Sequence, residues 1–363
     1  MNSKFKLLFL ATFIIVAGIL FSKEETSNFP FLKGPYLGQK PPGMTPEIFA
    51  PGIVSTENNE INSVFSPDGK EFFFARRNGN KLVMYFCREI NGIWTKPKAF
   101  PYCEGTFNGD MNYSPDGNRL YYCSNRKTDA SLGDLDIWYS ERTETGWSEP
   151  VNLGTPVNSS SSETYPVFTQ DGGLYFGSNR EGTRGDKDVY YSRFIDGKYT
   201  QPTPLGDTIN SDYGEGDTYV AFDESFMIIN SWGRPDGFGR GDLYISFKLV
   251  DGTWSRAKNM GKRINTEYLE FCPMLSPDGK YLFFTSYRGG NGDIYWVDAK
   301  IIETYKPENY EIQSQILGEK RMITQPCQIR VFRMGWSGFS KNSKKDRKGR
   351  FPEPGFGASP KIS

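Results

Sequence analysis

Short apolar runs alternate with polar turn segments along most of the chain. Runs such as 72–74, 120–122, 174–176 and 282–284 are rich in Phe, Tyr and Leu. They are too short for helices, and their aromatic content is typical of strands. Gly, Pro, Asp and Asn gather between them, where tight turns need them. The pattern predicts an all-β protein.

One turn motif repeats along the chain. Ser-Pro-Asp-Gly occurs at 66–69, 114–117 and 276–279, and weaker forms occupy 169–172 and 223–225, at spacings of 48 to 55 residues. Pro presets the first corner of such a turn, and Gly supplies its left-handed exit. With an apolar run on each side, every copy predicts a hairpin, and there are five copies.

Two further strands complete each repeat. A third strand, led by Asp in four copies, is expected at 82–85, 136–139, 188–191, 242–245 and 293–296. A fourth is expected at 94–97, 147–150, 199–202 and 254–257. Pro recurs in the fourth, which suits an edge strand. Four-stranded units repeated in series predict a β-propeller.

The ends of the repeat region predict how the ring closes. Residues 46–52 look like an unpaired fourth strand, and the fifth repeat lacks one. We therefore expect 46–52 to form the outer strand of the last blade of a five-bladed propeller. A six-bladed ring, with a degenerate blade from the tail, remains the alternative.

The blocks Ser276-Pro277-Asp278-Gly279-Lys280, Leu282–Ser286 and Gly292–Tyr295 resemble the WD40-like PD40 repeat of TolB-type propellers. The resemblance covers residues 46–305. It implies a periplasmic or cell-surface protein that interacts with other molecules. The sequence departs from TolB because it has no room for an α/β domain before the propeller.

The two ends differ from the body. Lys4 and Lys6 precede an apolar run at 7–21, so residues 1–25 predict a cleaved export signal or an uncleaved N-terminal anchor, followed by a linker at 26–45. Residues 306–363 read as a basic, disordered tail. Because the stretch between these ends is acidic, a nucleic-acid role is disfavoured.

The chain contains no His. This excludes a Ser-His-Asp or Cys-His catalytic centre and a His-ligated metal. The five Cys residues have no metal-binding spacing. We expect no cofactor and no metal, buried thiols at Cys87 and Cys123, and leave a disulfide of Cys103 open.

Residues present in every repeat are expected to support the scaffold. The Asp that leads the third strand should order its loop. Glu60, Glu163 and Glu270 should pair with the recurrent Arg residues that follow the second strands.

Residues that break the repeat are the better site candidates. The loop 232–242 is longer and richer than its counterparts. Trp and Arg are enriched where proteins bind one another. The expected binding residues are Trp232, Arg234, Phe238, Arg240, Tyr287 and Arg288.

Two functions fit these features. The first is a monomeric, non-catalytic propeller of the bacterial cell envelope that binds a protein or a glycan. The alternative is a carbohydrate-active hydrolase or lyase that uses a carboxylate pair, with Glu215 and Asp217 as candidates.

Overall fold

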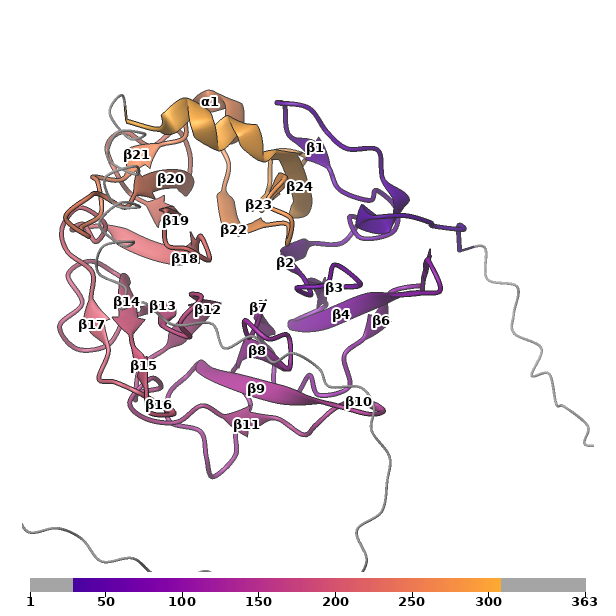
Figure 1. Cartoon of the computed structure of the whole chain (residues 1–363), viewed down its shortest axis with the longest axis horizontal. Helices are drawn as coiled ribbons and strands as arrows, with labels where there is room; N and C mark the ends of the chain where they lie inside the picture. The colour runs from indigo at the N-terminus through magenta and orange to yellow at the C-terminus, as the bar shows by residue number, and fades with distance from the viewer. Residues whose placement is uncertain (1–28, 308–363) are drawn as a thin grey trace, which may run out of the picture. The chain divides into compact units, whose positions relative to one another are not determined.

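The computed structural model describes residues 29–307, which form a ring of five antiparallel blades, A to E in chain order (Figure 1). The five-bladed prediction is confirmed. The inner strands are β2 (Glu60–Phe65), β7 (Asn108–Tyr113), β12 (Glu163–Phe168), β18 (Gly214–Val220) and β22 (Glu270–Leu275). The second strands are β3 (Glu71–Asn78), β8 (Arg119–Ser124), β13 (Leu174–Ser178), β19 (Phe226–Trp232) and β23 (Tyr281–Ser286).

The third strands are β4 (Lys81–Ile90), β9 (Asp136–Thr143), β14 (Asp188–Ser192), β20 (Asp242–Phe247) and β24 (Asp293–Asp298). The outer strands are β6 (Lys98–Ala99), β11 (Val151–Asn152), β17 (Thr203–Pro204), β21 (Lys258–Asn259) and, in blade E, β1 (Glu47–Ile48). Helical turns are short: η1 (Tyr36–Gly38), α1 (Gly261–Ile264) and η2 (Ala299–Tyr305). Within residues 29–307, no helix has the length and apolarity needed to cross a membrane.

The outer strands start later than the sequence predicts. The Trp- or Tyr-containing segments instead form β5 (Ile93–Trp94), β10 (Gly146–Trp147) and β16 (Lys198–Tyr199). β5 and β10 pair with the last residues of the third strand of their blade, and β16 pairs with β15 (Phe194–Ile195). In blades A to C the outer strand begins directly after Pro97, Pro150 and Pro202, and in blade D it begins at the same point after Ala257.

Ring closure depends on β1, as predicted. Glu47 and Ile48 pair antiparallel with Trp296 and Tyr295 of β24. The next residue, Phe49, is fully buried, and its ring lies 5.1 Å from the rings of Phe283 and Trp296. The first blade therefore cannot separate from the last without exposing this aromatic cluster.

The segment 29–45, expected as a linker, packs on the propeller. Leu37 is fully buried, and the hydroxyl of Tyr36 donates to Asp278 in the turn of blade E at 2.6 Å. The indole N–H of Trp94 donates to the carbonyl of Gly34 at 2.7 Å. The predicted signal (1–25) and nearly all of the predicted tail (306–363) lie outside the described residues.

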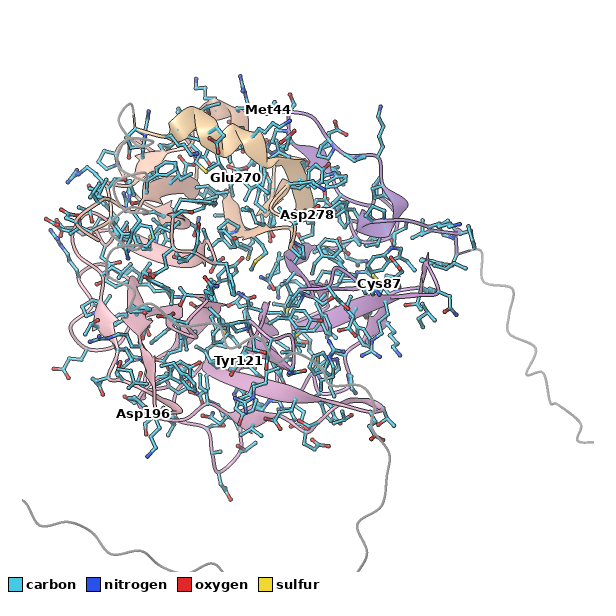
Figure 2. All side chains as sticks on the ribbon, in the orientation of Figure 1. Met44, Cys87, Tyr121, Asp196, Glu270 and Asp278 are labelled. Carbon is cyan, nitrogen blue, oxygen red and sulfur yellow. The ribbon has the colours of Figure 1, made fainter. Side chains whose placement is uncertain are left out.

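The core lies between neighbouring blades, where side chains fill the space (Figure 2). Each second strand is covered on both faces, so its residues are apolar in continuous runs. In β3, Phe72, Phe73, Phe74 and Ala75 are all fully buried. This is why the sequence shows runs of aromatics here and not a strict alternation.

We expect Phe49→Ala to lower the free energy of unfolding by about 3–5 kcal/mol, because it empties a fully buried aromatic site. Phe31, which is 71% exposed, offers the matched control, and Phe31→Ala should change it by less than about 0.5 kcal/mol. Urea unfolding measures both. Equal effects would show that Phe49 does not anchor the closure.

Candidate functional site

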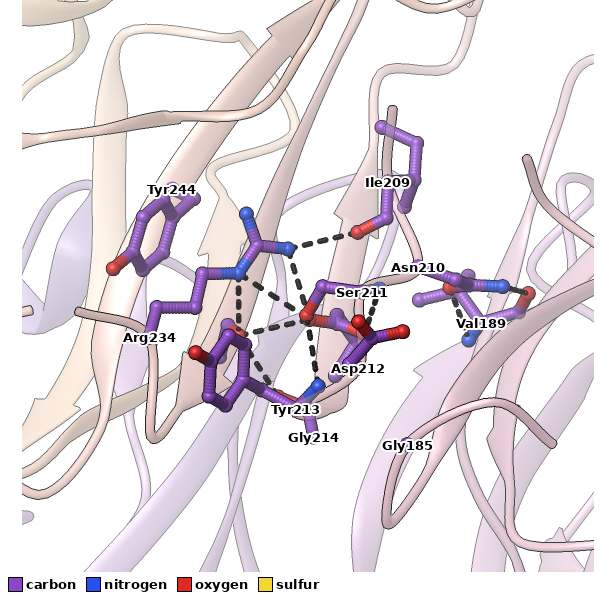
Figure 3. A network of polar contacts seen from close by, with 12 residues as sticks. Gly185, Val189, Ile209, Asn210, Ser211, Asp212, Tyr213, Gly214, Arg234 and Tyr244 are labelled. Atoms are coloured by element: carbon purple, nitrogen blue, oxygen red, sulfur yellow. Dashed lines mark hydrogen bonds and ion pairs between the residues drawn. The ribbon is translucent and has the colours of Figure 1, made fainter. Parts of the chain in front are cut away.

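A buried Glu stands at the start of four inner strands, at the seam with the preceding blade. In blade D, the N–H of Glu215 donates to the carbonyl of Lys187 in blade C at 2.8 Å. Its carboxylate accepts from the hydroxyls of Ser211 (2.6 Å) and Ser231 (2.9 Å) and from Arg234 (2.8 Å). Figure 3 shows Arg234 and Ser211 in this network. We call this set of contacts the seam clasp.

The seam clasp recurs around the ring. Glu163 pairs with Arg180 at 3.0 Å, Glu270 with Arg288 at 3.5 Å, and Glu60 with Arg76 at 2.6 Å. All four Glu side chains are fully buried, and the pairing predicted for Glu60, Glu163 and Glu270 is present. A buried carboxylate must be paired, so the seam geometry is tightly constrained.

The leading Asp of the third strand also acts as predicted in three blades. Asp136, Asp188 and Asp242 each accept hydrogen bonds from two backbone amides of the preceding loop. These carboxylates hold in place the loops at the end of the ring that carries the seam clasps.

Two predicted binding residues belong to this scaffold. Arg234 bonds to Glu215 and to the carbonyl of Ile209, and its guanidinium lies 4.6 Å from the ring centre of Tyr244 (Figure 3). Arg288 occupies the same position in blade E. Their side chains are 11% and 19% exposed, which leaves little surface for a ligand.

Trp232 and Tyr287 lie beside the inner strands. A Cβ atom at Gly214 would stand 2.1 Å from Cε2 of Trp232, so the indole covers the start of β18 where no side chain intervenes. The ring of Tyr287 stacks on Phe271 of β22, with centres 6.1 Å apart. Both rings are half-buried, and they belong to the adjacent blades D and E.

Phe238 and Arg240 lie farther out. Phe238 is 41% exposed, and the ammonium of Lys262 in α1 stands 5.6 Å from its ring centre. Arg240 is exposed, and α1 lies at the periphery of the ring (Figure 1). The structure therefore does not gather the six predicted residues into one site.

A ring of bulge residues lines the channel. Each inner strand shifts register just after its clasp position, at Asn62, Asp110, Tyr165, Asp217 and Cys272. Four of these have φ between 51° and 54°, which is strained for residues other than Gly; Asp217 is not among them. Such conformations concentrate at functional sites. The residue type changes from blade to blade, unlike the seam clasp.

The bulge residues interact across the channel. The hydroxyl of Tyr165 donates to the carbonyl of Pro273 at 2.7 Å and so spans from blade C to blade E. Oδ2 of Asp217 accepts from the N–H and Sγ of Cys272 at 3.3 and 3.2 Å. The side-chain nitrogen Nδ2 of Asn62 has no hydrogen-bond partner within residues 29–307, although this residue is fully buried.

The two bulge carboxyls and one ammonium group dominate the electrostatics. Burial, and then the charge of Asp217, raises the pKa of Asp110 to about 7. Burial also raises the pKa of Asp217, while Lys187 opposes both shifts. The ammonium of Lys187 donates to Thr164 at 3.1 Å. At neutral pH the carboxyl pair therefore retains a proton for part of the time.

The opposite end of the channel is apolar. A cavity of about 310 Å³ is lined there by the distal ends of all five inner strands, including Val64, Val167, Val220 and Met274. Asp110, Asp217 and Lys187 thus lie toward the end of the ring that carries the seam clasps, which we call the mouth of the channel, and the cavity lies at the end that carries the hairpin turns.

The structure separates the two carboxylates that the sequence analysis proposed as a pair. Glu215 is held in the seam clasp, whereas Asp217 acts on Asp110, which sequence reasoning missed. One signal in the sequence could have identified Asp110: the residue two positions after each clasp position differs from repeat to repeat. Across residues 29–307, no group of three or more Cys, Asp or Glu side chains is placed to hold a metal ion.

The cysteines of the described region are free thiols. Cys87, Cys123 and Cys272 are buried, as predicted for the first two, and Cys103 is half-buried and unpaired with any of them. Cys327 lies outside the described residues.

No protein family and no curated protein matches the sequence. Among solved structures, the chain is similar to a glycoside hydrolase (TM-score 0.49, 11% identity, 74% of this chain and 92% of that one). It is also similar to an endo-arabinase from Bacteroides thetaiotaomicron (TM-score 0.44, 14% identity, 68% and 95%). An oligogalacturonate lyase in complex with manganese gives a TM-score of 0.38 at 18% identity (69% and 65%). At these identities the likeness concerns the fold alone.

The seam clasp makes a stability prediction for two neighbouring Arg residues. Arg234→Met should lower the free energy of unfolding by about 3–5 kcal/mol, because it leaves the buried Glu215 carboxylate without its cation. Arg240→Met is the matched control and should stay within about 0.5 kcal/mol. Thermal or urea unfolding measures the difference. Similar values for both would contradict the scaffold role of Arg234.

Proposed function

We propose that the protein is an exported, non-catalytic propeller that binds a glycan at the polar mouth of its channel. This proposal rests on the group of charged side chains formed by Asp110, Asp217 and Lys187. None of these side chains takes part in a seam clasp, so the scaffold does not require them. Charged groups that the scaffold does not use and whose pKa is perturbed favour a functional site.

The chemistry of the mouth favours a sugar. Carboxyl and ammonium groups can exchange several hydrogen bonds with the closely spaced hydroxyls of a pyranose ring. Trp232 and Tyr287 add half-buried aromatic faces, which suit the apolar C–H face of a sugar. Gly216 links the aromatic and the charged groups, because it lies against Trp232 on one side. A Cβ atom placed at Gly177 would lie within 3.4 Å of both the Gly216 carbonyl oxygen and Cδ of Lys187.

Other features support the setting. The charged and apolar N-terminal pattern of residues 1–25 favours export. The PD40-like repeat favours a place in the periplasm or at the cell surface. A protein segment that enters the same mouth is the other ligand this setting allows.

Binding to polysaccharides prepared from a bacterial envelope, measured by calorimetry, tests the proposal. Asp217→Asn and Lys187→Met should each weaken binding at least about tenfold, since each removes a charge-assisted hydrogen bond. Asp196→Asn, in the β15–β16 hairpin, is the matched control and should bind as the wild type does. If all three proteins bind equally well, the mouth is not the site. If a peptide and no glycan binds with this dependence, the ligand is a protein.

The carboxyl pair favours a second candidate, glycosidic bond cleavage. Such hydrolysis needs an acid and a second carboxyl group, and Asp110, whose raised pKa keeps its proton toward neutral pH, and Asp217 would fill these roles. Asp110→Asn should then abolish the release of reducing ends from a bound glycan and leave its affinity within about threefold. Wild-type protein that binds a glycan and releases no reducing ends at any pH would leave the binding function alone.

The raised pKa of Asp110 predicts a pH-dependent effect on stability. The unfolded carboxyl ionises near pH 4 and the folded one near pH 7, so the wild type loses stability as pH rises between these values. Asp110→Asn removes this loss. Its melting temperature should match the wild type near pH 4 and exceed it near pH 8, by a margin worth at least about 1 kcal/mol. Asp196→Asn should show no such trend. A constant difference across this range would contradict the shifted pKa.

A further inference from the structure

The seam between blades A and B lacks the carboxylate of the seam clasp. Asn108 stands where Glu163, Glu215 and Glu270 stand in the later blades. Its amide oxygen accepts from the hydroxyl of Ser124 at 2.9 Å, as the Glu oxygens accept from the equivalent Ser residues. The substitution keeps this hydrogen bond and removes the negative charge.

The cation of the clasp is nevertheless retained. Arg126 donates from Nε to Ser124 at 3.3 Å and from Nη2 to the carbonyl of Tyr102. Its guanidinium lies 5.1 Å from the ring centre of Trp138, just as Arg180 lies 5.0 Å from Tyr190. Arg126 therefore holds the pose that its counterparts hold beside a carboxylate.

The positive charge of Arg126 is buried and uncompensated. This residue is 5% exposed and forms no ion pair with any residue between 29 and 307, whereas its three counterparts each pair with a Glu. Glu104, four residues before Asn108, is exposed and does not pair with Arg126. A buried charge without a counter-charge is strongly unfavourable.

Further donors at this seam lack acceptors. Nε1 of Trp138 is buried without a partner, although this side chain is 3% exposed. In the other seams the second Glu oxygen accepts from the backbone amide four residues earlier, at 2.9 Å for Ser159 and Glu163. The equivalent amide, that of Glu104, has no acceptor within residues 29–307. Donors without acceptors at a buried cation describe an anion site.

We propose that the A–B seam binds a small monovalent anion, of the chloride type, in the place of the missing Glu carboxylate. Arg126 supplies the charge, and the Glu104 amide supplies a hydrogen bond. Asn108 is one methylene shorter than Glu, and its amide oxygen already accepts from Ser124, so only a small anion is proposed. The exposed position of Glu104 gives bulk ions a path to the seam.

Melting temperatures of the full chain, measured in sodium chloride and in sodium gluconate at equal ionic strength, test this proposal. The wild type should melt about 2–4 °C higher in chloride, because only the folded state binds the ion. Asn108→Glu restores the covalent carboxylate. It should melt above the wild type in gluconate and show no response to chloride.

Two outcomes would overturn the proposal. One is a wild type that melts at the same temperature in both salts. The other is an Asn108→Glu variant that responds to chloride as the wild type does. Glu104→Gln is the matched control and should keep the full chloride response; a response that appears only in this variant would show that Glu104 itself supplies the charge.

A crystallographic measurement keeps the proposal testable if Asn108→Glu does not fold. Wild-type crystals soaked in bromide should give an anomalous peak beside the guanidinium of Arg126. Equivalent positions beside Arg180 and Arg234 should give none, because carboxylates occupy them. No peak at Arg126, or peaks at all three, would contradict the assignment.

Discussion

The buried carboxylate at the start of an inner strand is the interaction on which this ring depends. Glu215 and its equivalents receive donors from the connection before them, from their own blade and from an Arg that also bonds to a backbone carbonyl of that connection. Desolvating such a group is unfavourable unless every donor is in place. The clasp therefore stabilises one relative placement of two blades over all others. Its regular repetition explains why five weakly similar sequence units form one regular ring.

The clasp also positions the residues that the scaffold does not need. Two residues after it, the strand bulges, and the side chain at that point enters the channel. The backbone is left-handed at Asp110 and Cys272, two residues after Asn108 and Glu270. The same bulge carries Asn62 and Tyr165 in other blades, so one scaffold presents different chemistry from each blade. Asymmetry in a nearly symmetric ring thus arises at the bulge positions, and at the A–B seam where Asn108 replaces Glu.

Much of the fold follows from local sequence chemistry. The Ser-Pro-Asp-Gly turns fix the hairpins, and the missing fourth strand of the last repeat correctly indicates closure by β1. The outer strands were misplaced by several residues because the segments of Trp94 and Trp147 pair with the last residues of the third strand, and this pairing is not visible in one sequence. The site was harder to predict. Arg234 and Arg288 resemble binding residues because their buried partner, a Glu of the inner strand, lies 18 or 19 residues away. Asp110 and Asp217 belong to non-adjacent blades, and only the closed ring brings their charges together.

Asp110 is expected to retain a proton near neutral pH, because it is buried and the charge of Asp217 acts on it. Infrared difference spectroscopy of the carboxylic acid C=O stretch, recorded on the wild type and on Asp110→Asn across a pH titration, tests this most directly. A carboxyl that titrates near pH 7 should be present in the wild type and absent from the variant, as the pKa of Asp110 requires. If every carboxylic acid band is already lost when the pH has been raised to about 5, as for ordinary Asp and Glu side chains, the raised pKa of Asp110 is wrong.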